Sequence, residues 1–143
     1  MIDYKVVKKT DNTRILELYR LAGWWEMDDN PAYLDTVAGI IASTFCFVIA
    51  EEDGAILGMG RAISDGFSDA YIQDVTVDPV HRGKGIGKGI IRTLVSFLQE
   101  HKIQWIGLIS EPGYERFYQS LGFSVMPSYT PFLLDQNQKR EEE

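Results

Sequence analysis

The seven residues 82–88 combine glycine with positive charge in a pattern that suits a phosphate-bearing ligand. They read Arg-Gly-Lys-Gly-Ile-Gly-Lys, within a chain of 143 residues whose net charge is −7. Glycine lets the backbone approach a ligand closely, and basic side chains attract its negative charge. We therefore predict that this turn binds an anionic small molecule; a solvated basic loop is the alternative interpretation.

The elements expected on either side of the turn favour ligand binding. A strand is expected over 70–77, and the periodicity changes after Pro79. Apolar residues then recur every four positions from Ile86 to Leu98, which predicts an amphipathic helix that ends near His101. A helix that starts at the turn would supply unpaired backbone N–H groups and the positive end of its dipole.

Two familiar nucleotide-binding turns do not fit the same residues. A P-loop that ends at Gly87-Lys88 would require a glycine in place of Arg82 and a Ser or Thr in place of Gly89. The Rossmann pattern Gly-x-Gly-x-x-Gly would place its third glycine on Lys88 or Ile90. The turn therefore belongs to another class of anion site.

The rest of the sequence predicts strands and helices in an order typical of an α+β fold. Expected strands cover 2–7, 45–51, 55–63, 70–77, 103–109, 123–126 and 131–134, and expected helices cover 11–22, 31–42, 86–101 and 112–121. We predict one domain over 1–135, with a mixed, mostly antiparallel central sheet of about six to seven strands flanked by about four helices. Residues 136–143 are expected to form a disordered polar tail.

Two sequence blocks resemble the GNAT superfamily of N-acetyltransferases. Arg-Gly-x-Gly-x-Gly follows the strand end at 75–79, as in the coenzyme A signature of that superfamily, and 117–123 resembles its Phe-Tyr-x-x-x-Gly-Phe block. A narrower resemblance is carried by 61–66 and 70–75. It is to a subgroup of bacterial acetyltransferases and plant plastid-type enzymes that act on arylalkylamines or protein amines.

The resemblance implies an enzyme that moves the acetyl group of acetyl-CoA, its co-substrate, to a primary amine by direct attack in a ternary complex. The residues implied to bind acetyl-CoA are Val75, Val77, Arg82, Gly83, Lys84, Gly85, Ile86, Gly87, Lys88, Phe117 and Tyr118. Tyr118 matches the family tyrosine that protonates the departing thiolate; packing in the core is the alternative for this side chain. A non-catalytic acyl-CoA-binding sensor or partner subunit with the same fold is the alternative function.

The proton acceptor for the amine is marked less clearly. A common family position for Glu or His falls on Gln73, which cannot accept a proton and is assigned to substrate binding. Asp74 lies next to it but, by strand alternation, on the other face, so a β-bulge would be needed to re-aim it. Asp74 is the candidate base; the alternative is that it caps backbone groups or pairs with an arginine. Glu111, where many relatives have asparagine, is a second departure from the family.

Substrate contacts are expected from the aromatic and acidic segment after the first expected helix. Trp24 and Trp25 would face the amine, and Asp28, with its neighbours Glu26 and Asp29, would attract its charge. The alternative for the tryptophans is that at least one of them anchors the helix to the core.

Composition and charge argue against several other classes of protein. The negative net charge argues against nucleic acid as a partner, and no apolar run approaches the roughly 20 residues of a membrane helix. Nothing resembles a metal site, and the single cysteine, Cys46, is expected to pack in the core. We expect a cytoplasmic enzyme whose acceptor is a small-molecule or a protein amine; a homodimer is left open.

Overall fold

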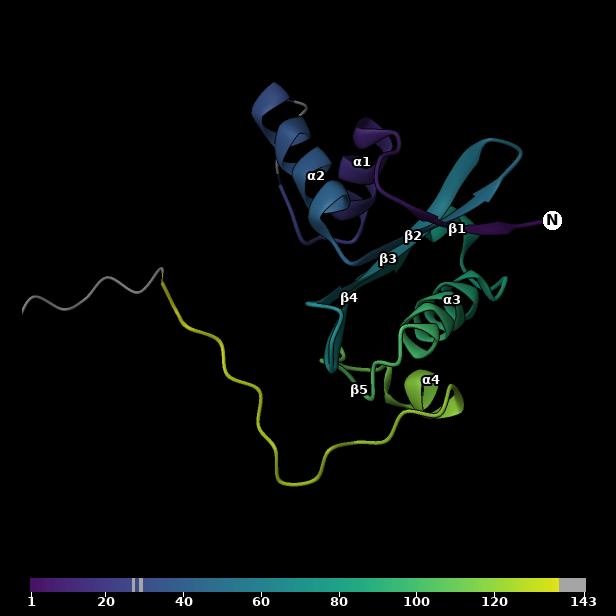
Figure 1. Cartoon of the computed structure of the whole chain (residues 1–143). Helices are drawn as coiled ribbons and strands as arrows, with labels where there is room; N and C mark the ends of the chain where they lie inside the picture. The colour runs from purple at the N-terminus through teal and green to yellow at the C-terminus, as the bar shows by residue number, and fades with distance from the viewer. Residues whose placement is uncertain (27, 29, 137–143) are drawn as a thin grey trace, which may run out of the picture. The chain divides into compact units, whose positions relative to one another are not determined.

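The computed structural model describes residues 1–26, 28 and 30–136, and Figure 1 labels its helices and strands. The chain divides into two compact units: the first is Met1–Leu108, and the second begins at Ile109. The first unit contains the sheet, and the second contains the short helix α4 (Glu115–Ser120). The expectation of one domain over 1–135 stays a prediction.

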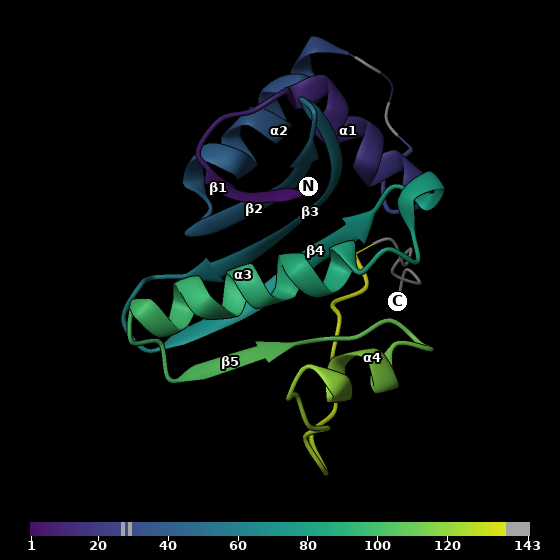
Figure 2. The same cartoon turned by 90° about the vertical axis from the view of Figure 1, so that its right-hand side faces the viewer.

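The first unit is built on five strands whose order in space follows their order in the chain (Figure 2). β1 (Asp3–Val7), β2 (Cys46–Glu52), β3 (Ala55–Ser64) and β4 (Asp69–Val77) pair antiparallel. β5 (Trp105–Leu108) pairs parallel to β4. The mixed, mostly antiparallel sheet predicted from the sequence is confirmed.

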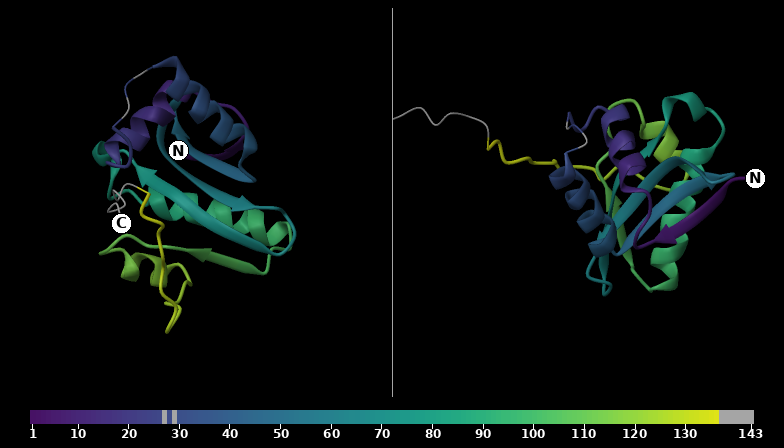
Figure 3. Two further views of the ribbon diagram at one scale, coloured as in Figure 1. Left: turned by 90° about the vertical axis from the view of Figure 1, so that its left-hand side faces the viewer. Right: turned by 90° about the horizontal axis from the view of Figure 1, so that it is seen from above.

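Helices cover both faces of this sheet (Figure 3). α1 (Asn12–Leu21) and α2 (Pro31–Ser43) lie on one face, and α3 (Ile86–Glu100) lies on the other. The Asp11 carboxylate and the Asn30 side-chain oxygen each accept a hydrogen bond from a backbone N–H in the first turn of α1 and α2, respectively. These caps satisfy donors that a helix N-terminus otherwise leaves unpaired, so both helix starts are set locally.

The apolar stripes of the helices form the core on each side of the sheet. On one side, α1 and α2 pack against β2 and β3 through Ile15, Leu16, Leu18, Tyr19, Val37, Ile41, Phe47, Ile49, Ile56 and Met59. On the other side, α3 buries Ile86, Ile90, Ile91, Leu94 and Leu98, which include the four-residue spacing that predicted this helix.

Two glycines on β3 allow α3 to lie close to the sheet. A Cβ atom on Gly60 would lie 2.7 Å from Ile90 Cγ2 of α3, and one on Gly58 would lie 3.1 Å from Ile90 Cδ1. Both distances are shorter than van der Waals contact, so a side chain at either position would force the packed elements apart. The glycines therefore set the position of α3 against the strands that precede the glycine-rich turn.

The C-terminal part of the fold differs from the prediction. Segments 123–126 and 131–134 form no strand, so the described part of the chain has five strands rather than six or seven. Short apolar runs do not by themselves distinguish a strand from other structure, and Pro127 and Pro131 remove two backbone donors from this stretch. Of the expected tail over 136–143, all but Gln136 lies outside the described residues.

Candidate active site

A β-bulge interrupts β4 at Asp74. Arg61 of β3 pairs with Gln73, whereas Met59 pairs with Thr76, so one residue of β3 faces two residues of β4. Asp74 has φ +56°, in the left-handed region that residues other than glycine seldom adopt. The β-bulge that would be needed to re-aim the Asp74 side chain is therefore present.

Both donors to the Asp74 carboxylate bind the same oxygen. The Tyr19 hydroxyl and the Arg61 Nε–H each donate to Oδ2 at 2.7 Å. The side chains of Asp74 and Arg61 are 24% and 17% exposed, so this ion pair is largely shielded from water. The interpretation that Asp74 pairs with an arginine is thus supported by the geometry, and its role as a base stays a prediction.

Tyr19 connects this ion pair to the expected substrate segment. Its ring is 1% exposed and stacks flat on Trp25, with centroids 4.0 Å apart and planes 6° apart, while Trp24 meets it edge-on at 6.2 Å. Burial, followed by the nearby Asp74 carboxylate, raises the pKa of the Tyr19 phenol well above its usual value. Trp24 and Trp25 both pack against the core, as the alternative interpretation expected of at least one of them.

The acidic residues of this segment are only partly described. Glu26 and Asp28 are exposed, and Asp28 Oδ1 accepts a hydrogen bond from the Asn30 backbone N–H at 3.0 Å. Asp29 lies outside the described residues. The structure brings Asp28 to the loop that leads into α2.

The glycine-rich turn follows β4 and opens α3, the order predicted from the sequence. Gly85 is the N-cap of α3 with φ +77° and supplies no side-chain cap, so Ile86, Gly87 and Lys88 form the uncapped first turn. Gly83 has φ +82°, and a Cβ atom on Gly83 or Gly85 would meet nothing within 4 Å. The turn is therefore open, and its helical N–H groups can reach a ligand.

The basic side chains of the turn are exposed. Arg82 Nε donates weakly to the carbonyl oxygen of Val77 at 3.3 Å, and Lys84 Nζ lies 3.5 Å from His81 Nδ1. Within the described ranges, no carboxylate forms an ion pair with either of them or with Lys88. The Ile86 side chain, by contrast, is buried in the core, so only its backbone can face a ligand.

Among the residues that the structure describes, no strand pairs with the end of β4 on its β5 side. The β4–β5 ladder runs from Asp69 opposite Trp105 to Ile72 opposite Leu108, and β4 continues to Val77 beyond it. Val75 and Val77 thus lie beyond the end of this ladder. A free strand edge can accept an extended, amide-containing ligand by strand addition.

Tyr118 and Phe117 lie on α4, in the second unit. The Tyr118 ring contacts the rings of Phe117 and Phe123 edge-on, with centroids 5.1 and 6.0 Å away. Burial, then the negative charge of Glu111 and the nearby Tyr114, raise the pKa of the Tyr118 phenol above its usual value. Tyr118 is therefore a protonated, potential hydrogen-bond donor at neutral pH.

Arg14 holds in place the segment that precedes the glycine-rich turn, a role that the sequence did not suggest. It donates from Nε to the Ile56 carbonyl oxygen at 2.9 Å and from Nη2 to Asp78 Oδ2 at 2.8 Å. Arg14, together with the Val80 backbone N–H, holds the pKa of the Asp78 carboxyl below its usual range. Asp78 in turn caps the short 3₁₀ helix Pro79–His81, so Arg14 ties the end of β4 to α1 and β3.

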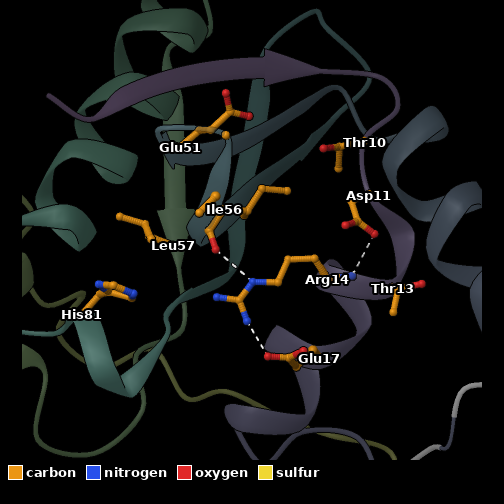
Figure 4. A pocket seen from close by; sticks show the side chains of 11 residues that line it. Thr10, Asp11, Thr13, Arg14, Glu17, Glu51, Ile56, Leu57 and His81 are labelled. Carbon is orange, nitrogen blue, oxygen red and sulfur yellow. Dashed lines mark hydrogen bonds and ion pairs between the residues drawn. The ribbon is translucent and has the colours of Figure 1, made fainter.

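Arg14 also lines an open cavity of about 510 Å³ (Figure 4). Its walls come from the start of α1, the β2–β3 hairpin and the 3₁₀ helix: Thr10, Asp11, Thr13, Arg14, Glu17, Glu51, Gly54, Ala55, Ile56, Leu57 and His81. None of the predicted site residues lines it. Within residues 1–26, 28 and 30–136, no cluster of His, Cys, Asp and Glu is arranged to hold a metal ion, and no helix is long and apolar enough to cross a membrane.

The sequence profile of the acetyltransferase (GNAT) family matches residues 12–123, and the chain belongs to this family. It is 39% identical over 77 residues to GCN5-related N-acetyltransferase 2, chloroplastic, of Arabidopsis thaliana, a match that covers 54% of this chain and 30% of that protein. It is 32% identical over 124 residues to the uncharacterized N-acetyltransferase ycf52 of Porphyra purpurea, covering 81% of this chain and 70% of the relative. The chain thus spans about a third of the length of the plant relative and most of the red algal one.

Solved structures show the same fold. A GNAT family acetyltransferase from Streptococcus pneumoniae TIGR4 superposes with a TM-score of 0.79 at 22% identity, covering 96% of this chain and all of that one. AAC(6′)-Iy in complex with the bisubstrate analog CoA-S-monomethyl-acetylneamine superposes with a TM-score of 0.73 at 19% identity, covering 94% and 99%. The resemblance to the GNAT superfamily and the predicted fold class are confirmed.

Proposed function

We propose that the protein is an N-acetyltransferase that transfers the acetyl group of acetyl-CoA to a primary amine by direct attack within a ternary complex. The observation that carries this proposal is the open glycine-rich turn at the start of α3, which a single 3₁₀ turn separates from the bulged strand that presents Asp74. Membership of the acetyltransferase family and the N-acetyltransferase names of the relatives support the reaction class.

The residues of the turn fit the pyrophosphate of acetyl-CoA. The N–H groups of Ile86, Gly87 and Lys88 carry the positive end of the α3 dipole, and the glycines leave the space in front of them open. Arg82, Lys84 and Lys88 add three positive charges in a chain that is otherwise acidic. The backbone at Val75 and Val77 would pair with the amides of pantetheine along β4, beyond the end of its ladder with β5.

The chemistry requires a base for the amine and an acid for the departing thiolate. An alkylamine with a pKa of about 10 is roughly three units, or about 4 kcal/mol, from its reactive form at pH 7. We assign its proton to Asp74, directly or through a water molecule. The amine nitrogen then attacks the thioester carbonyl carbon, the C–S bond breaks, and the leaving thiolate takes a proton from the Tyr118 hydroxyl. The second proton that the nitrogen gives up as the amide forms returns through water to the Tyr118 phenolate. Phe117 would contact the acetyl-CoA beside Tyr118.

The pKa of the acceptor amine sets how the rate depends on pH. Tyr19 and Arg61 both donate to Oδ2 of Asp74, so one oxygen of this carboxylate is already hydrogen-bonded. Because an alkylamine with a pKa of about 10 is mostly protonated at pH 7, we expect the reaction to depend partly on the amine that solution has already deprotonated. The rate should accordingly rise with pH between neutral and mildly alkaline conditions.

The acceptor is proposed to enter between the segment after α1 and the bulged strand. Trp24 and Trp25 would contact its carbon skeleton, Asp28 would attract its charge, and Gln73 would hydrogen-bond to it. Both a small-molecule amine and a protein amine fit this arrangement. A cytoplasmic location stays an expectation and a homodimer stays open; the Arabidopsis relative is chloroplastic by name.

A panel of amines tests the proposal. The purified chain is incubated with acetyl-CoA and polyamines, arylalkylamines or lysine peptides, and acetylated product is detected by mass spectrometry alongside release of the CoA thiol. We expect at least one class to gain an acetyl group. Binding of acetyl-CoA without transfer to any amine would favour the non-catalytic acyl-CoA-binding function, which the Arg61–Asp74 ion pair also permits.

A further inference from the structure

The two oxygens of the Asp74 carboxylate are not equivalent. Tyr19 and Arg61 both donate to Oδ2, each at 2.7 Å. No residue in the described part of the chain donates to Oδ1. Because two donors from different elements fix one oxygen, the carboxylate cannot rotate about its Cβ–Cγ bond without losing both, and the direction of Oδ1 is fixed as well.

Tyr19 is itself held firmly. It belongs to α1, its ring is 1% exposed, and the indole of Trp25 stacks on that ring with planes 6° apart. A buried, stacked ring can neither tilt nor swing to another rotamer without opening the core. The Tyr19 hydroxyl is therefore a fixed point on the α1 side of the sheet, and it holds a carboxylate that lies on the bulge of β4, where Asp74 has φ +56°.

We propose that Tyr19 is a positioning residue of the acetyl-transfer site, which together with Arg61 fixes Oδ2 of Asp74 so that Oδ1 is presented to the acceptor amine. The inference rests on the proposed function and deepens it. The acceptor must then carry an N–H that can donate to Oδ1, as the primary amine of the proposed function does. The stack of Trp25 on Tyr19 further couples the substrate segment to the orientation of the carboxylate.

A double-mutant cycle separates positioning from structural support. Tyr19→Phe removes only the hydroxyl, and Asp74→Asn keeps an acceptor oxygen for Tyr19 and Arg61 but cannot take a proton. Tyr33→Phe is the matched control, because Tyr33 packs against the same core and no described residue hydrogen-bonds to its hydroxyl. The values of kcat and of KM for acetyl-CoA are measured for the four chains of the cycle and for the control, with urea unfolding to establish that each is folded.

The proposal predicts a specific pattern. Tyr19→Phe lowers kcat on the order of tenfold, because misplacement of a reacting group is costly, while KM for acetyl-CoA changes by less than about twofold. In the Asp74→Asn chain the same change lowers kcat by less than about twofold, because the two residues act as one unit. Tyr33→Phe leaves kcat unchanged.

The inference would be overturned if Tyr19→Phe lowered kcat equally in the wild-type and Asp74→Asn chains, or if it did not lower kcat in the wild-type chain. Either result would leave the proposed function intact. A wild-type chain that transfers acetyl to no amine would overturn the proposed function and this inference with it. The two failures are therefore distinguishable in one set of measurements.

Discussion

Replacement of Tyr118 by phenylalanine isolates the proposed acid, because it removes one hydroxyl and little else. The ring contacts with Phe117 and Phe123 remain available to phenylalanine, and no described residue hydrogen-bonds to the Tyr118 hydroxyl. The free energy of unfolding should therefore change by less than about 0.5 kcal/mol, the range of substitutions that lose no buried contact. A large fall in kcat could then not be attributed to a loss of folded protein.

The expected effect on catalysis is large. A positioned acid typically contributes about 10²–10⁴-fold, so kcat at saturating acetyl-CoA should fall at least about tenfold in Tyr118→Phe. Burial and the charge of Glu111 raise the pKa of the Tyr118 phenol, so the wild-type acid stays protonated through neutral and mildly alkaline pH. Binding of acetyl-CoA should be nearly unchanged. Tyr129→Phe, which removes the hydroxyl of a largely exposed tyrosine in the same unit, is the matched control.

Steady-state kinetics across pH measures this prediction. A kcat for folded Tyr118→Phe within about twofold of wild type would mean that water protonates the thiolate or that chemistry is not rate-limiting. Rapid-quench measurement of the acetyl-transfer step separates these cases. An unchanged transfer rate would remove Tyr118 from the mechanism and assign its ring to packing.

Three further predictions follow from the first unit. Asp74→Asn should lower kcat most at neutral pH and recover at high pH, where the amine loses its own proton; an unchanged pH profile would assign Asp74 to structure alone. Gly60→Ala places a methyl group 2.7 Å from Ile90 and should lower the free energy of unfolding in urea by about 1–3 kcal/mol, whereas the control Gly39→Ala, in open space on α2, should raise it slightly. Burial raises the pKa of the Cys46 thiol to about 12, so a thiol reagent near pH 8 should label it only after unfolding; rapid labelling of the folded chain would contradict its burial.

Features that depend on neighbouring residues could be predicted from the sequence. The glycine-rich turn and α3 are encoded within about twenty residues: glycine sets the turn, and the four-residue apolar spacing sets the helix. The β2–β3 hairpin follows equally from Asp53-Gly54, which both adopt positive φ. These local signals were sufficient to give the order of elements in the first unit.

Features that depend on distant residues were missed or only half predicted. Tyr19 donates to Asp74 across 55 positions of sequence, and Arg14 pairs with Asp78 across 64. Tyr19 also fits the apolar stripe of α1, so helical spacing classified it only as a core residue. Arg61 had a signal, because it stands within the block that resembles the narrower subgroup. Strand alternation puts Asp74 on the opposite face from Gln73, so the sequence could indicate that a bulge was needed. It could not indicate which side chains bind the Asp74 carboxylate, because they come from other elements.

The C-terminal strands illustrate the opposite error. Residues 123–126 and 131–134 have strand-like composition, yet composition does not supply the neighbouring strand whose N–H and C=O groups would complete a ladder. The described chain leaves Phe132 and Leu133 more than nine-tenths exposed. Sequence periodicity alone therefore overestimated the width of the sheet.

The central claim, that acetyl-CoA binds at the turn over 82–88, is tested most directly by isothermal titration calorimetry on Gly85→Glu and Gly54→Glu. Both glycines have φ near +80° with nothing within 4 Å of a Cβ atom, so both substitutions carry similar backbone strain, but only Gly85 opens α3. We predict that Gly54→Glu binds acetyl-CoA like the wild type and that folded Gly85→Glu shows no measurable binding, because a carboxylate would occupy the pyrophosphate position. Undiminished binding of acetyl-CoA by folded Gly85→Glu would contradict the claim.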